Sequence, residues 1–161
     1  METSTFTAGC QIRDAVKVLV SKGAPPEEDW PYDISKFSVR PPAKATRDAK
    51  KEVVLKYERI ATPLEARACI ASGNPYIVGF TLFESFESDE VAKTGMVPMP
   101  EPDEREIGGH CVLGFGYDET HDEYLNSWSS DWGDCGYFKV PRAYVEQYAS
   151  DMWAIIACEQ R

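Results

Sequence analysis

The last third of the chain contains a strand, a short polar turn and a second strand, and this pattern constrains the fold more than any other. The two predicted strands are residues 108–117 and 123–128, and the turn between them is residues 118–122. Strands joined by so short a turn are antiparallel neighbours. His110 lies at the start of the first strand and Asn126 near the end of the second, so both side chains are expected at the same end of the hairpin.

Side-chain alternation along these strands indicates what the His110 and Asn126 side chains can do chemically. It places Cys111 on the face opposite His110, in the predicted core, and it puts Trp128 on the same face as Asn126, where it can shield a histidine–amide hydrogen bond from water. An amide oxygen that accepts from one ring nitrogen fixes the imidazole, so the other nitrogen can take a proton from a thiol. The pattern therefore predicts a histidine that an amide holds in the orientation of a general base.

The first third of the chain predicts one helix followed by irregular structure. Residues 12–22 have apolar side chains on one face, and Gly23 is the expected helix stop. Residues 24–48 contain five prolines and a Trp30-Pro31-Tyr32 cluster. Proline lacks an amide donor and restricts the residue before it, so long regular elements are excluded there. We expect an ordered wrap that aromatic side chains hold in place.

The middle of the chain predicts a strand and a capped helix. Residues 52–60 are rich in strand-forming residues. Thr62 is the expected N-cap of the next helix, with Pro63 in the first turn and Glu65 closing a capping box. This helix is expected to end near Gly73.

The remaining segments predict a sheet interrupted by loops. The expected buried strand is 75–83, the acid-rich and solvated loops are 84–90 and 101–106, and the later strands are 136–140 and 152–158, with a helical turn opened by Pro141 between them. Helix and strand are segregated along the chain, which is typical of an α+β fold. We expect a single domain over residues 1–161, with a partial helical lobe and proline-rich wrap in 1–50 and a mainly antiparallel β lobe in 51–161.

Charge and hydropathy exclude several functions. Seventeen basic and 27 acidic residues give a formal net charge of −10, which repels nucleic acid and anionic lipid. No apolar run approaches the ~20 residues that cross a bilayer. Residues 1–5 have neither the basic region nor the apolar core of an export signal. We therefore expect no nucleic-acid partner, no membrane association and a cytoplasmic location.

The cysteines predict neither a disulfide framework nor a zinc site. The five are Cys10, Cys69, Cys111, Cys135 and Cys158, which are scattered and never in Cys-x-x-Cys spacing. A reduced compartment is therefore expected, and most of the five are expected to be small buried hydrophobic residues. His121 is expected as a solvated residue of the hairpin turn. A metal site made from His110, Cys111, His121 and Cys135 is disfavoured, because alternation points Cys111 away from His110. No metal and no cofactor are expected.

Three motifs together carry a resemblance to a known family. In chain order they are Gly108-Gly109-His110-Cys111-Val112, Asn126-Ser127-Trp128 and Trp132-Gly133-Asp134-Cys135-Gly136-Tyr137-Phe138. The sequence resembles the papain-like (papain and cathepsin) cysteine peptidases, of whose domain it matches the later part. The resemblance implies a papain-like fold with a truncated helical lobe. It also implies that His110 is the catalytic base, Asn126 the residue that orients it and Trp128 the shielding indole.

The nucleophile of that family is not recognisable in this sequence. The family carries it near the start of the mature domain as Cys-Gly-Ser/Ala-Cys-Trp/Tyr, on a helix N-terminus and shortly after an oxyanion-hole glutamine. Residues 1–161 contain no such segment. Cys10 precedes a helix, but Gln11 follows it instead of preceding it, and no aromatic residue comes next.

Three hypotheses follow. The first is a catalytically inactive pseudopeptidase or protein-binding domain. The alternative is the C-terminal part of an active thiol peptidase whose nucleophile segment lies on a removed or separate chain. The third is unaided chemistry by Cys10. In the first two cases a two-lobed fold without its nucleophile helix exposes apolar surface, so self-association or a protein or peptide partner is expected.

Overall fold

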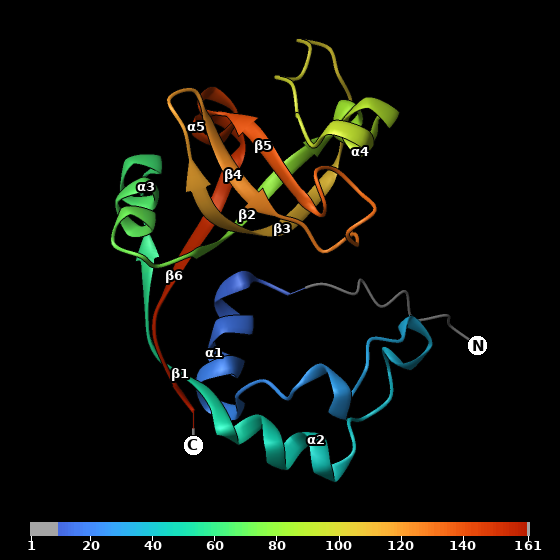
Figure 1. The fold of residues 1–161 in the computed structure, drawn as a ribbon, viewed down its shortest axis with the longest axis vertical. Helices are drawn as coiled ribbons and strands as arrows, with labels where there is room; N and C mark the ends of the chain where they lie inside the picture. Colours follow the sequence, from blue (N-terminus) through green and yellow to red (C-terminus); the bar gives the residue numbers. More distant parts are fainter. Residues whose placement is uncertain (1–9, 161) are drawn as a thin grey trace, which may run out of the picture. The chain divides into compact units, whose positions relative to one another are not determined.

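The structure, a computed structural model, describes residues 10–160, with side chains described up to residue 157. The chain divides into two compact units (Figure 1). Among the described residues, the first is made of residues 10–55 and 158–160, and the second of residues 56–157. The single domain expected over residues 1–161 stays a prediction.

The first unit is built from short helices, as the prolines indicate. Helix α1 (Ile12–Lys22) has the predicted bounds and buries Val16. Gly23 ends it with a φ of 77°, and its amide donates to the Leu19 carbonyl at 3.0 Å. A Cβ atom at Gly23 would lie 1.8 Å from the Ala49 carbonyl oxygen, so no other residue fits this helix stop.

The proline-rich wrap contains only short elements, which confirms that prediction. They are the 3-10 helices η1 (Glu27–Asp29), η2 (Ile34–Lys36) and η3 (Ala49–Lys51), and the six-residue helix α2 (Ala43–Asp48). The carboxylate of Asp48 is largely buried beside the ammonium groups of Lys44 and Lys51, at 3.3 and 2.8 Å. The Lys51 pair ties the end of α2 to the turn that leads into the sheet, and the Lys44 pair lies within α2.

A six-stranded sheet dominates the rest of the chain. Its spatial order is β1-β6-β2-β3-β4-β5, and the described pairings from β6 through β5 are all antiparallel. The strands are β1 (Glu52–Ile60), β2 (Tyr76–Phe83), β3 (Glu106–Tyr117), β4 (His121–Leu125), β5 (Tyr137–Pro141) and β6 (Ala149–Gln160). The predicted α+β class and the predicted hairpin are therefore confirmed.

The second unit contains three helices beside the sheet. Helix α3 (Pro63–Ala71) begins as predicted: the Thr62 hydroxyl accepts from the Glu65 amide at 3.2 Å, and the Glu65 carboxylate accepts from the Ala61 amide at 2.7 Å. Helix α5 (Arg142–Tyr148) follows Pro141, and its buried Tyr144 donates to the Thr81 carbonyl of β2 at 2.8 Å. Helix α4 (Asp89–Thr94) was not predicted.

The prediction of a solvated loop over residues 84–90 is wrong. The segment forms the 3-10 helix η4 (Glu84–Glu87) and opens α4, where the Ser88 hydroxyl accepts from the Val91 amide at 3.3 Å. Phe86 and Val91 are buried. The acidic side chains stay on the outside, so the segment is an amphipathic covering and not a loop.

Two further expectations need correction. Strand β4 ends at Leu125, so Asn126 to Trp128 lie beyond it, because the Asn126 amide bonds to the Gly136 carbonyl at 2.9 Å instead of continuing the ladder with β3. His121, expected in the turn, is the first residue of β4. In the described part of the chain, no helix has the length and apolar character needed to cross a membrane.

Most described cysteines are not buried, contrary to expectation. Cys10, Cys111 and Cys135 are exposed, and Cys69 is partly buried with its thiol donating to the Asn74 carbonyl at 3.3 Å. Cys111 does lie on the face of β3 opposite His110, but that face is open at this position, so Cys111 is not a core residue.

Candidate active site

The imidazole of His110 and the side-chain amide of Asn126 form a direct hydrogen bond. Nε2 of His110 lies 2.8 Å from Oδ1 of Asn126. The pair forms because β3 and β4 are antiparallel with Leu113 opposite Leu125, so the residue after β4 returns toward the first half of β3. Asn126 is 8% exposed and His110 is partly buried. The two residues predicted from the hairpin are therefore brought together.

The orientation of the Asn126 amide determines which ring nitrogen carries the proton. The backbone N–H of Ser127 donates to Oδ1 of Asn126 at 2.8 Å, which identifies this atom as the carbonyl oxygen. The same oxygen faces Nε2 of His110, so Nε2–H is the donor of the pair. In the neutral imidazole Nδ1 is then an acceptor, which is the form required of a base.

An aromatic cluster encloses this hydrogen-bonded pair. The rings of His110 and Trp128 lie 4.8 Å apart between centroids at an angle of 33°, and Trp132 meets Trp128 edge-on at 5.1 Å. Phe86 contacts both tryptophans. Trp128 thus lies over His110, where it was predicted to lie. The sequence reasoning missed Phe86, although a single aromatic residue within an acid-rich run is a signal of a buried anchor.

Two glycines shape the loop that carries Trp132. Gly133 has a φ of 64°, and a Cβ atom there would lie 2.5 Å from the Tyr137 carbonyl oxygen. Gly136 has a φ of 90°, and its amide donates to the Trp132 carbonyl at 2.8 Å. A side chain at either position would strain the loop, so the backbone conformation explains why the third motif has glycine at these two positions.

The turn between β3 and β4 is fixed by Asp118. Its carboxylate accepts from the backbone amides of Thr120 and His121, each at 2.8 Å, and from the ammonium group of Lys139 at 3.3 Å. The amide bonds, and to a lesser extent Lys139, hold the pKa of Asp118 well below its ordinary value. This turn fixes the hairpin whose other end carries the His110–Asn126 pair.

Neither Cys111 nor Cys69 has the setting that the family pattern requires of the nucleophile. Cys111 follows His110 but points to the other face of β3. Cys69 is bonded to the Asn74 carbonyl. Burial raises the pKa of the Cys69 thiol, which disfavours the reactive thiolate. Cys10 is exposed beside Gln11, the N-cap of α1. Across residues 10–157, no cluster of three histidine, cysteine or acidic side chains could hold a metal ion.

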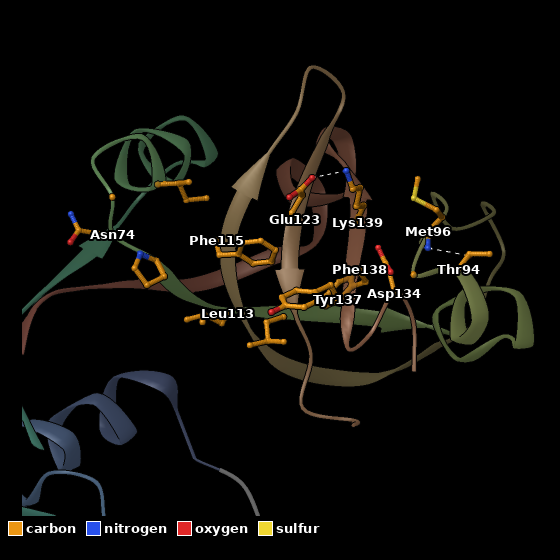
Figure 2. Close-up of a pocket in the computed structure, with 15 residues that line it drawn as sticks. Asn74, Thr94, Met96, Leu113, Phe115, Glu123, Asp134, Tyr137, Phe138 and Lys139 are labelled. Atoms are coloured by element: carbon orange, nitrogen blue, oxygen red, sulfur yellow. Dashed lines mark hydrogen bonds and ion pairs between the residues drawn. The ribbon is translucent and has the colours of Figure 1, made fainter. Parts of the chain in front are cut away.

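A broad groove crosses the other face of the same strands (Figure 2). Its volume is about 750 Å³, and its floor is a row of three paired residues, Leu113, Leu125 and Tyr137. The Phe115 ring meets Tyr137 at 5.2 Å between centroids. Beside this row Glu123 and Lys139 form an ion pair at 2.5 Å, visible as a dashed line in Figure 2. The groove is thus mainly apolar; Glu123 and Lys139 pair with each other, and Asp134 adds a carboxylate to its lining.

This fold and this histidine–asparagine pair define the class of protein. The family model for papain family cysteine proteases matches residues 3–157, and the chain belongs to that family.

Individual relatives agree with the family match. The chain is 42% identical over 161 residues to an uncharacterized peptidase C1-like protein of Acanthamoeba polyphaga mimivirus, covering 92% of this chain and 52% of that protein. It is 30% identical over 150 residues to pro-cathepsin H of Mus musculus, covering 88% and 40%. The crystal structure of xylellain, a cysteine protease from Xylella fastidiosa, matches with a TM-score of 0.82 and 33% identity, covering 91% and 61%. The chain thus spans about half the length of the curated relatives it matches.

Proposed function

We propose that residues 1–161 carry the base half of a papain-like cysteine peptidase site and do not hydrolyse peptides on their own. His110 is the base, Asn126 orients it and Trp128 shields their hydrogen bond. The nucleophilic thiol and the oxyanion-hole donor come from polypeptide outside these residues. The observation that carries the proposal is the hydrogen bond from His110 Nε2 to Asn126 Oδ1, at 2.8 Å.

The proposed chemistry follows from the ring nitrogen that this hydrogen bond leaves available. Nδ1 of His110 takes the proton of an approaching thiol, and the thiolate attacks the peptide carbonyl carbon. The imidazolium is stabilised because Nε2–H stays bonded to the Asn126 oxygen. The imidazolium then gives its proton to the leaving amine as the peptide C–N bond breaks, which leaves an acyl-enzyme. Water hydrolyses that thioester with His110 again acting as base.

Without a thiol and an oxyanion hole this sequence of steps cannot begin. Removal of a single oxyanion-hole donor lowers the rate by about 100-fold to 1000-fold, and loss of the nucleophile removes covalent catalysis altogether. Residues 1–161 contain no recognisable segment that would supply either group. We therefore expect the imidazole to be correctly oriented and chemically idle in the isolated chain.

Hydrolysis of a fluorogenic peptide amide by the purified chain tests the proposal. The expected rate is the buffer rate, unchanged in His110→Ala and in Cys10→Ser. Turnover that is lost in His110→Ala and on alkylation would contradict it. If that turnover were also lost in Cys10→Ser, Cys10 would be the nucleophile.

A second candidate function is a pseudopeptidase that acts as a protein-binding domain. The groove across β3, β4 and β5 favours it, because an apolar hollow of about 750 Å³ can take up apolar side chains of a partner. Purification of the chain from its source separates the two candidates. A second polypeptide with a cysteine-led helix, or such a segment encoded in frame upstream, favours the peptidase; a partner without one favours the binding domain.

A further inference from the structure

We infer that Phe86 is a positioning residue of the histidine site, because its ring fixes Trp128 over the His110–Asn126 hydrogen bond and keeps water from it. The inference rests on the proposed role of His110 as a base. It goes further by assigning a role to η4, a segment outside the three sequence motifs.

The Phe86 ring is the common contact of the aromatic cluster. Phe86 is 0% exposed. Its centroid lies 6.5 Å from the His110 ring and 5.6 Å from the Trp128 ring, both nearly edge-on, at 69° and 87°. It stacks on Trp132 at 5.7 Å and 17°, and it meets Phe138 of β5 at 5.3 Å. Trp128 therefore contacts His110, Trp132 and Phe86, and Phe86 also contacts the other two of these rings.

The two residues just before Phe86 are held in place by hydrogen bonds to residues 104 and 105. The Ser85 amide donates to the Glu104 carboxylate at 2.5 Å, and the Glu84 amide donates to the Arg105 carbonyl at 3.2 Å. The Arg105 guanidinium also bonds to the Glu84 carboxylate at 2.7 Å. Glu104 in turn accepts from the Glu101 amide at 3.0 Å. Phe86 is thus inserted into the cluster from a restrained turn, so its ring can transmit an orientation to its neighbours.

The Phe86 ring limits the rotation of the Trp128 side chain and the access of water to the His110–Asn126 hydrogen bond. Edge-to-face rings hold one another at fixed angles, and a close-packed interior leaves little room for rotation. A smaller, non-aromatic side chain at position 86 removes both edge contacts. Trp128 then gains room to rotate away from His110. Water reaches the Nε2–H bond more often, and the imidazole loses its single orientation.

Exchange of the His110 Nε2 proton with water, measured by NMR, tests this role in the isolated chain. We expect Phe86→Leu to accelerate the exchange by about tenfold, which corresponds to ~1.4 kcal/mol of lost protection. Phe83→Leu is the matched control: Phe83 packs on Tyr144 and Tyr148 and lies in β2 next to η4. In that variant the exchange rate of the His110 Nε2 proton should stay within about twofold of the wild-type rate, which corresponds to less than ~0.5 kcal/mol.

A third variant separates positioning from general stability. Phe86→Tyr keeps the ring but adds a hydroxyl to a buried position, so it lowers the urea midpoint while the proton exchange stays slow. Unchanged exchange in Phe86→Leu, or equal acceleration in Phe83→Leu, would overturn the inference. Because the readout is a proton of the resting chain, it is independent of turnover. Peptide hydrolysis by the isolated chain would refute the proposed function and leave this result standing.

Discussion

At the level of single residues, Asn126 combines a structural role with a chemical one. Its buried oxygen accepts from both His110 and Ser127. Its amide nitrogen is buried without a hydrogen-bond partner among the described residues. A polar group in that state destabilises the fold by about 1–3 kcal/mol. The orientation useful for a base is thus kept at the expense of one unpaired donor.

Replacement of Asn126 by alanine tests this balance. Asn126→Ala removes two accepted hydrogen bonds and leaves the Ser127 amide without its partner, so we expect a loss of about 1–2 kcal/mol in unfolding free energy. Urea unfolding gives this value. Asn74→Ala, which removes an amide that bonds to the Ser72 carbonyl at 3.3 Å, is the control and should change stability by less than ~0.5 kcal/mol. Equal losses in the two variants would mean that the Asn126 bonds add nothing.

At the level of elements, the predictions that succeeded rest on local chemistry. A few neighbouring residues are enough to predict each of them: the capping box at Thr62, the helix stop at Gly23, and the hairpin with His110 and Asn126 at one end. The pairing of β3 with β4 starts at their short turn, but its register shifts by one residue between Gly114 and Gly116, which the turn alone does not predict. The shielding role of Trp128, expected from side-chain alternation and from the family resemblance, stays a prediction together with the catalytic roles of the pair.

The predictions that failed depend on contacts between distant segments. Residues 84–90 were expected to be a loop because of their acidic side chains, yet four aromatic rings from β3, β5 and the loop before β5 enclose Phe86. Cys111 was placed in the core on the assumption that both faces of β3 are covered. Its face instead carries the exposed residues of the groove. The single aromatic residue at position 86 is a local signal of a buried anchor, but the rings that enclose it and the open face of β3 depend on contacts between distant segments.

The turn of the β3–β4 hairpin predicts a pH dependence. The pKa of Asp118 is lowered in the folded chain, so its contribution to stability is present above the unfolded pKa of ~3.9 and is lost as the pH falls. Asp118→Asn should lower the urea midpoint at pH 7, and its difference from wild type should shrink steadily below about pH 4. Glu119→Gln, in the same turn, removes an equal charge and is the control. A difference that is constant from pH 7 to pH 2 would contradict the assignment.

At the level of the whole molecule, the groove face predicts association. Phe115, Leu125 and Tyr137 are exposed there together, and such a patch is usually covered by protein. Light scattering at micromolar concentration should therefore give a mass above the 18.1 kDa of one chain, unless a partner is present. Phe115→Lys should return the mass to that of a monomer. Leu64→Lys is the control, because Leu64 is 73% exposed on α3 outside the groove. A monodisperse 18.1 kDa wild type would reject the prediction.

The central claim is that His110 is held as a ready base by an amide, with Nε2 protonated and Nδ1 available. The ¹⁵N chemical shifts of the His110 ring, recorded on the neutral imidazole, report this directly. We predict a protonated Nε2 and an unprotonated Nδ1 in the wild type, and averaged shifts in Asn126→Ala because nothing then fixes the tautomer. A proton on Nδ1 in the wild type, or tautomers already averaged there, would contradict the account.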